Sequence, residues 1–131
     1  MNDSSFQTDE TGSVDADNMK AVTLLLSAST ITGDDVYNLK NEEVGKIQDI
    51  MFDIAEGEIR YAVLAAGGFL GMGDRLFAVP WNALKHDESN RRFILDVDVE
   101  RLKDAPGFDK DQWPNMADTS WSSTVETFYT R

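Results

Sequence analysis

The residues best suited to bind a phosphate are the four glycines of the segment GGFLGMGD, at positions 67–74. Glycine-rich loops bind phosphate when their backbone N–H groups converge at a helix N-terminus, usually with a lysine and a hydroxyl residue behind them. Here neither a Gly-x-Gly-x-x-Gly pattern nor a Gly-Lys-Ser/Thr ending occurs, and Asp74 would repel a phosphate. The residues that follow, RLFAVPW, are typical of a strand. We therefore interpret positions 67–74 as a connection between two strands, with Phe69, Leu70 and Met72 forming an apolar contact surface on the loop.

The other candidates for catalysis or metal binding are one histidine and many carboxylates. His86 lies in the polar segment KHDESN, where we expect a solvated surface side chain, and the chain has no cysteine, so a transition-metal site is not expected. The acidic segments 53–64 and 109–118 lack oxygen ligands at the positions that a calcium loop requires. We expect Asp49 to cap backbone at a bulge and Asp53 to face water, so they do not form a catalytic pair. We predict no enzyme activity, no metal and no cofactor.

The composition of the chain limits the classes of partner and the cellular locations that we expect. The net charge of −12 repels phosphate backbones, so we expect no nucleic-acid partner. No stretch reaches the roughly 20 apolar residues that a membrane span needs, and AVTLLL at 21–26 is too short. The absence of cysteine excludes disulfides and thiol nucleophiles and is compatible with the cytosol. We expect a cytoplasmic protein without membrane insertion.

Short apolar segments separated by turn residues predict a mainly β domain. Alternating apolar residues mark 44–54 and 91–97 as half-buried strands, and the almost wholly apolar 59–66 is typical of a central strand covered on both sides. Together with 35–38 and 75–81, these closely spaced strands predict a small antiparallel barrel or rolled sheet. The side chains expected to point inward are those of Phe52, Tyr61, Val63, Val79 and Leu95.

Local patterns also predict how the strands bend and end. Ile47 is out of phase with Ile50, and a bulge near Gln48 would bring both side chains to the same face. Gly57, in the segment AEGE, is expected to adopt positive φ in a hairpin turn. Residues 82–90 are expected to form a short turn.

Two short helices are expected in the C-terminal region. Asp98 precedes VERLKDAPG as a helix N-cap, with Leu102 on the buried side and Pro-Gly as the stop. Farther along, Trp121, Val125 and Phe128 recur at the i, i+4 and i+7 spacing of one helical face.

We divide the chain into three parts. Residues 1–19 are acidic with few large apolar side chains, so we expect a disordered tail. Residues 20–107 form the β domain, and residues 108–131 form an extension with the aromatic helix. That helix folds back onto the domain or packs on a second subunit, and the sequence leaves both arrangements open.

Four segments together resemble the PRC-barrel family: GDDVYN (33–38), EEVGKIQDIMFD (42–53), GEIRYAVLAAGGFLGMGDRLFAVPWNAL (57–84) and FILDVDVERLKDAPGFD (93–109). This family includes the cytoplasmic domain of the photosynthetic reaction-centre H subunit and the C-terminal domain of a ribosome-maturation factor. The resemblance covers about residues 28–109. The structural motif consists of Gly45, Asp49, Asp53, Gly67, Gly68, Gly71, Pro80 and Trp81.

The resemblance implies a small six-stranded antiparallel β-barrel that binds proteins or assembles, with no shared catalytic residues. A small barrel cannot enclose both faces of 59–66, the loop side chains and the aromatic extension, so we expect a homodimer that docks on a protein partner. The expected interaction surface consists of Phe69, Leu70, Met72, Trp113, Trp121, Phe128 and Tyr129. The alternatives are a protein that binds a small ligand or a metal ion, and a soluble relative of the electron-transfer H subunit.

Overall fold

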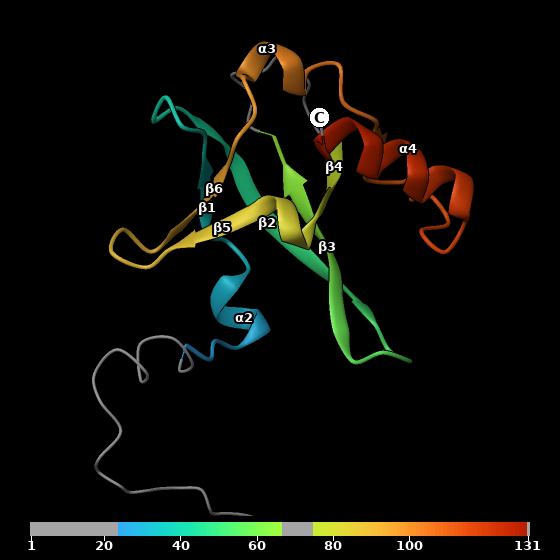
Figure 1. The fold of residues 1–131 in the computed structure, drawn as a ribbon, viewed down its shortest axis with the longest axis horizontal. Coiled ribbons are helices and arrows are strands. Elements are labelled where there is room, and N and C mark those ends of the chain that lie inside the picture. The colour runs from blue at the N-terminus through green and yellow to red at the C-terminus, as the bar shows by residue number, and fades with distance from the viewer. Residues whose placement is uncertain (1–23, 67–74, 131) are drawn as a thin grey trace, which may run out of the picture.

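The computed structural model describes residues 24–66 and 75–130 (Figure 1). The expected tail at 1–19 and the glycine-rich segment 67–74 lie outside the described residues. The elements are α2 (Ala28–Ile31), β1 (Asp35–Tyr37), β2 (Glu43–Asp53), β3 (Glu58–Ala65), β4 (Arg75–Pro80), the 3-10 helix η3 (Trp81–Ala83), β5 (Leu84–Asp87), β6 (Arg92–Leu95), α3 (Val99–Leu102), β7 (Gly107–Asp109) and α4 (Thr119–Thr130).

The strands form one curled, mixed sheet in the order β5-β6-β1-β2-β3-β4-β7. All neighbours are antiparallel except β1 and β6, which run parallel with Val36 opposite Phe93. The prediction of a mainly β domain is confirmed. The six-stranded antiparallel barrel is wrong in detail, because the described residues form seven strands and the edge strands β5 and β7 are not paired with each other.

The two edge strands explain the difference in strand number. β5 occupies residues that we expected to form a turn, and its sequence LKHD contains only one aliphatic side chain, Leu84. Its backbone nevertheless pairs with β6 from Leu84 opposite Leu95 to Asp87 opposite Arg92. β7 has three residues and begins at the glycine of the expected Pro-Gly stop, so no alternation marks it. The formation of β5 and β7 therefore depends more on pairing with a neighbouring strand than on the apolar pattern of their own sequences.

Two β-bulges shape the long β2–β3 hairpin. The strand register makes Gln48 the extra residue in β2 and Arg60 the extra residue in β3. The first bulge leaves Ile47 and Ile50 both buried, which confirms the predicted bulge. Gly57 in the connecting turn has φ 71°, as predicted for a position that favours glycine.

The strand β3 is buried on both faces along most of its length, which confirms the prediction for the strand at 59–66. Ala62 and Leu64 point into a core formed by side chains from α2, β1, β2, β3, β4, β6 and α3. Tyr61 and Val63 point to the opposite face, where a second cluster includes Val125 of α4. The alternation of β3 therefore divides its side chains between two cores.

Phe52 is the exception among the five side chains expected to point inward. The other four are buried: Tyr61, Val63, Val79 and Leu95. Phe52 lies opposite Ile59, which packs against the first core, so its strand phase is correct. The β2–β3 hairpin extends beyond the rest of the sheet, however, and 51% of the Phe52 surface is exposed (Figure 1). Ile54 follows with 87% exposed.

The short helix α3 begins where the sequence predicts. Asp98 occupies the N-cap position with extended backbone, and Leu102 is buried. The Asp98 carboxylate makes no capping hydrogen bond, and it lies 3.2 Å from the ammonium group of Lys40. Within residues 24–66 and 75–130, no helix is long and apolar enough to cross a membrane.

Candidate functional site

The helix α4 begins at a well-defined cap. The carboxylate of Asp118 accepts hydrogen bonds from the N–H and the hydroxyl of Ser120, at 2.9 and 2.8 Å. These bonds hold the pKa of Asp118 below its ordinary value. The bond from the Ser120 hydroxyl has the larger effect, followed by the bond from the Ser120 N–H. A charged carboxylate at this position also stabilises the positive end of the helix. The residue just before the predicted helical face therefore fixes where the helix starts.

One face of α4 lies on the sheet. Val125 is fully buried among Tyr61, Val63 and the apolar residues of β4 and β7. The ring of Trp121 meets the ring of Tyr61 edge-on, with centroids 5.4 Å apart. In this chain the second face of the sheet is thus covered by α4. The i, i+4 and i+7 spacing predicted one helical face for Trp121, Val125 and Phe128. These three residues do lie on the face of α4 that packs against the cores.

The end of α4 contacts α3 through two aromatic residues. The guanidinium of Arg101 lies 4.1 Å from the ring centre of Phe128 and donates a hydrogen bond to the Phe128 carbonyl oxygen. Tyr129 contacts both cores, and its hydroxyl is buried without a hydrogen-bond partner among the described residues. Burial raises the pKa of the Tyr129 hydroxyl, and the positive charge of Arg101 opposes that shift.

A cleft of about 550 Å³ lies between the start of β3, the η3 turn and the end of α4. Its apolar wall includes Ile59, Pro80 and Trp81, and its polar wall includes Glu58, Arg60 and Glu126. The cleft therefore combines an aromatic and aliphatic surface with a mixed set of charges.

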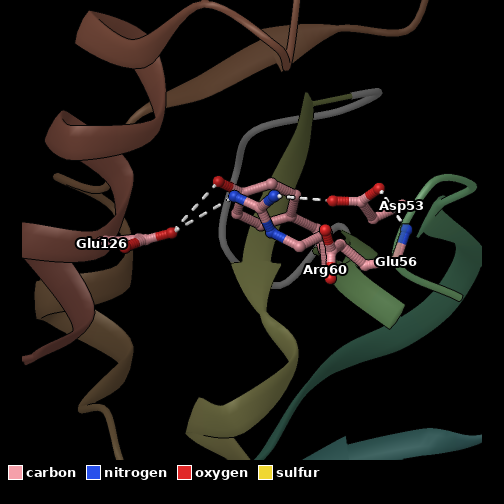
Figure 2. A network of polar contacts seen from close by, with 5 residues as sticks. Asp53, Glu56, Arg60 and Glu126 are labelled. Carbon is pink, nitrogen blue, oxygen red and sulfur yellow. Dashed lines mark hydrogen bonds and ion pairs between the residues drawn. The ribbon is translucent and has the colours of Figure 1, made fainter. Parts of the chain in front are cut away.

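Arg60, the extra residue of the second bulge, connects the β2–β3 hairpin to α4 (Figure 2). Its guanidinium lies 3.3 Å from the carboxylate of Asp53 and 3.9 Å from that of Glu126. The Tyr61 hydroxyl donates to Glu126 at 3.4 Å, and the N–H of Glu56 donates to Asp53 at 3.1 Å. Tyr61, and after it Asp53, raise the pKa of Arg60, so the guanidinium stays charged. Exposed ion pairs contribute little stability, so this network mainly sets the position of the hairpin relative to α4.

Two residues of the expected structural motif have a clear structural role: Gly45 allows two strands to pack closely, and Asp49 binds backbone beside a bulge. A Cβ atom at Gly45 would lie 2.5 Å from the carbonyl oxygen of Ala65, so β2 approaches β3 too closely for any other residue. The carboxylate of Asp49 accepts a hydrogen bond from the N–H of Ile50 at 2.8 Å, beside the first bulge. Gly67, Gly68 and Gly71 lie outside the described residues.

Of the remaining motif residues, Pro80 and Trp81 line the cleft, and Asp53 pairs with Arg60 of the cleft wall. Asp53, which we expected to face water, instead binds the N–H of Glu56 and pairs with Arg60. Pro80 ends β4 in a buried position, and Trp81 begins η3 with its ring 5.6 Å from that of Phe93. Pro80 and Trp81 thus form part of one wall of the cleft.

The aromatic residues of the expected interaction surface that the structure describes differ in their exposure. Trp121, Phe128 and Tyr129 are partly buried on α4. Trp113 is 40% exposed, with its ring 5.1 Å from that of Phe108 and its indole N–H donating to the Lys110 carbonyl at 2.8 Å. The three loop members of this surface lie outside the described residues: Phe69, Leu70 and Met72.

His86 is not the solvated side chain that we expected. It lies on β5 opposite Phe93, with ring centroids 4.8 Å apart, and is partly buried. The prediction was wrong because the strand that carries His86 was taken for a turn. In residues 24–66 and 75–130, no three His, Cys, Asp or Glu side chains are grouped closely enough to hold a metal ion.

The sequence did not predict the charged contacts of the cleft or the exposed apolar residue at the end of the hairpin. Arg60 was the one charged residue in an otherwise apolar strand, which was the available signal. Its contact with Glu126 depends on a bulge and on the placement of a helix far along the chain. Ile54 was assigned to the strand, and the exposed position at the end of the hairpin was not foreseen.

The family model of the PRC-barrel domain matches residues 25–102. Among solved structures, the chain is similar to a putative 16S ribosomal RNA processing protein, RimM, from Pseudomonas aeruginosa. That similarity has 15% sequence identity and a TM-score of 0.44, and it covers 62% of this chain and 49% of the other. The match therefore spans about half the length of that protein. A search of curated proteins found no match.

Proposed function

Because the chain belongs to the PRC-barrel domain family, we propose that it is a non-catalytic protein-interaction module that docks on a protein partner and self-associates. The observation that carries this proposal is the exposure of Phe52 and Ile54 at the end of a hairpin that extends past the sheet (Figure 1). Large apolar side chains gathered at a projecting element are typical of contact surfaces.

The charged groups of the cleft support a role in binding. Arg60 is paired with Asp53 and Glu126, and its pKa is raised, so it cannot act as a general base. Tyr61 also has a raised pKa, caused by burial and then by Glu126, which keeps its hydroxyl neutral at ordinary pH. General acid–base catalysis requires a group that exchanges a proton near ordinary pH. Arg60 and Tyr61 do not meet this requirement, and their contacts instead position α4 and the β2–β3 hairpin.

Self-association is proposed through apolar side chains that α4 does not cover. Because α4 already covers Tyr61 and Val63, the proposed contact uses Trp113 together with the loop residues Phe69 and Leu70, which lie outside the described residues. We also propose that the module lies in the cytoplasm. Cell fractionation tests this location.

Light scattering on a sizing column tests self-association. We expect the mass of a dimer at micromolar concentration and ordinary salt, and a monomer mass would refute this part of the proposal. A dimer that dissociates after Phe69→Asp with Leu70→Asp would place the interface on the loop. A dimer that survives both substitutions but dissociates after Trp113→Ser would place it on the extension.

Partner docking is tested with the tagged full-length chain. A protein captured by the chain should, once purified, form a complex of fixed stoichiometry with it, measured by light scattering. If no captured protein forms such a complex, the docking function is refuted.

A second candidate function is the binding of a small ligand in the cleft. Its volume of about 550 Å³ falls within the roughly 300–1,000 Å³ of ligand pockets. A thermal-shift screen with calcium, magnesium and common cofactors tests this candidate, since a ligand bound to the folded state raises its stability. A saturable rise in melting temperature would favour the candidate, and no rise would favour the interaction module.

A further inference from the structure

We propose that the end of the β2–β3 hairpin and the adjoining cleft form one docking surface for a partner segment with a large apolar side chain flanked by lysine or arginine. This inference rests on the proposed function, because it names the surface and the chemistry of the partner. The docking surface consists of Phe52, Ile54, Glu56, Glu58, Ile59 and Trp81.

The strand pairing brings the apolar part of the docking surface to one face of the hairpin. Phe52 and Ile59 are directly opposite each other on β2 and β3, and side chains at paired positions point to the same face. Ile59 also lines the cleft together with Trp81. The exposed part of Phe52 is therefore on the same face as Ile59 in the cleft wall, and Ile54, which is 87% exposed, follows two residues later in the turn. An apolar side chain that enters the cleft would also cover Phe52.

The structure keeps the two walls of the cleft in place. Trp81 is supported from behind by the ring of Phe93, with centroids 5.6 Å apart. On the opposite side, the contacts of Arg60 with Asp53 and Glu126 join the hairpin to α4 (Figure 2). A preformed cleft lowers the ordering cost of binding.

The charges at the rim select a cationic partner. Arg60 is offset by Asp53 and Glu126, whereas the exposed carboxylates of Glu56 and Glu58 make no ion pair within the described residues. The rim therefore carries excess negative charge beside apolar side chains. Lysine or arginine next to an apolar anchor complements this arrangement, and charge complementarity determines partner choice.

The same charges argue against two other occupants. A second copy of the chain would present the same acidic rim and a net charge of −12. Residues 1–23 of the chain itself contain five acidic residues and a single lysine, so that segment is also repelled. A basic partner segment is the occupant that the charges favour.

The probe for the test is a fluorescein-labelled 18-residue amphipathic peptide of leucine and lysine, added at nanomolar concentration to the full-length chain at 150 mM salt. Fluorescence anisotropy gives the dissociation constant. The comparison peptide has glutamate in place of every lysine. We expect the leucine–lysine peptide to bind at least tenfold more tightly than the comparison peptide, because only it complements the rim.

Two pairs of variants separate this surface from general attraction to an acidic protein. Phe52→Ser with Ile54→Ser should weaken binding at least tenfold, whereas Leu25→Ser with Leu39→Ser, which removes two apolar side chains that are 91% and 71% exposed elsewhere, should change it less than twofold. Glu56→Gln with Glu58→Gln should weaken binding about fivefold. The control with equal charge loss, Glu88→Gln with Asp111→Asn, should change it less than twofold, since those exposed residues lie outside the docking surface.

Several results would overturn the inference. Equal losses in the test and control pairs would show nonspecific attraction. A dimer that dissociates in the Phe52→Ser, Ile54→Ser variant would make a second copy the occupant. A tenfold gain in peptide affinity after deletion of residues 1–19 would make that segment the occupant. If the peptide does not bind, but a purified native partner binds wild type and the Phe52→Ser, Ile54→Ser variant equally, the surface is wrong while the proposed function stands. If the tagged chain forms no complex of fixed stoichiometry with any protein, the proposed function fails as well.

Discussion

Val125→Ala is the change that best tests how α4 is held on the sheet. Val125 is fully buried at the centre of the second core, between Tyr61 and the apolar residues of β4 and β7. The substitution keeps the helix and removes two methyl groups from this contact. Thr127→Ala is the matched control, because Thr127 is also β-branched and lies exposed on the same helix.

The expected loss follows from three contributions. Two buried methyl groups are worth about 1.6 kcal/mol at about 0.8 kcal/mol each. The space they leave adds up to about 1 kcal/mol where the neighbouring side chains do not close it. The better helix propensity of alanine returns about 0.5 kcal/mol. Val125→Ala should therefore lower the free energy of unfolding by about 2 kcal/mol, and Thr127→Ala should leave it unchanged or raise it by about 0.5 kcal/mol.

Urea denaturation followed by circular dichroism measures both variants. A loss below about 0.5 kcal/mol for Val125→Ala would refute the burial of this side chain, since surface substitutions have effects of that size. Repeating the measurement over a hundredfold range of protein concentration separates packing on the same chain from packing on a second subunit. The loss should not depend on concentration if α4 covers the sheet of its own chain.

Four further predictions concern separate features. Gly45→Ala should lower the free energy of unfolding by about 1–3 kcal/mol, because its methyl group would lie 2.5 Å from the Ala65 carbonyl oxygen; an unchanged urea midpoint would contradict this close approach. Tyr129→Phe should raise the free energy of unfolding by about 1 kcal/mol, because it removes a buried hydroxyl without a partner among the described residues; a loss of similar size would reveal a partner. The raised pKa values of Tyr61 and Tyr129 mean that these tyrosines keep their protons longer in the folded state, so their contribution to stability should be constant up to about pH 10 and decline above it, less steeply in Tyr129→Phe. Urea midpoints at a series of pH values test the sign, and a midpoint that rises above pH 10 would contradict it. Deletion of residues 1–19 should leave the melting temperature nearly unchanged, and a loss of more than about 4 °C would show that the segment is packed.

The sequence predicted the parts of the fold that depend on neighbouring residues. The spacing of Ile47 and Ile50 predicted a bulge, and the apolar strand at 59–66 predicted burial on both faces, because each signal lies within one element. The parallel pairing of β1 with β6 could not be read in this way, since it joins distant segments. β5 was hidden because LKHD has no alternation, although Phe93 on β6 gives His86 a partner.

The candidate site was less predictable than the fold. Phe52 has the correct strand phase, but the point at which a core ends depends on the lengths of the neighbouring strands, which local periodicity does not give. Arg60 contacts Glu126 only because a bulge and a helix from the extension meet at the cleft. The aromatic spacing on α4 predicted a helical face correctly, but not which surface that face would cover.

The parallel contact between β1 and β6 has a consequence for the order in which the protein folds. β2, β3, β4 and β5 all lie between these two strands in the sequence, so β1 can pair with β2 early but must wait for β6. Contacts between distant segments close long loops and slow folding. Until β6 arrives, β1 exposes an open edge with Val36, which is buried in the finished sheet. The joining of the β5–β6 hairpin to β1 is thus the step expected to limit the folding rate, and the step at which an intermediate is most prone to pair with another chain.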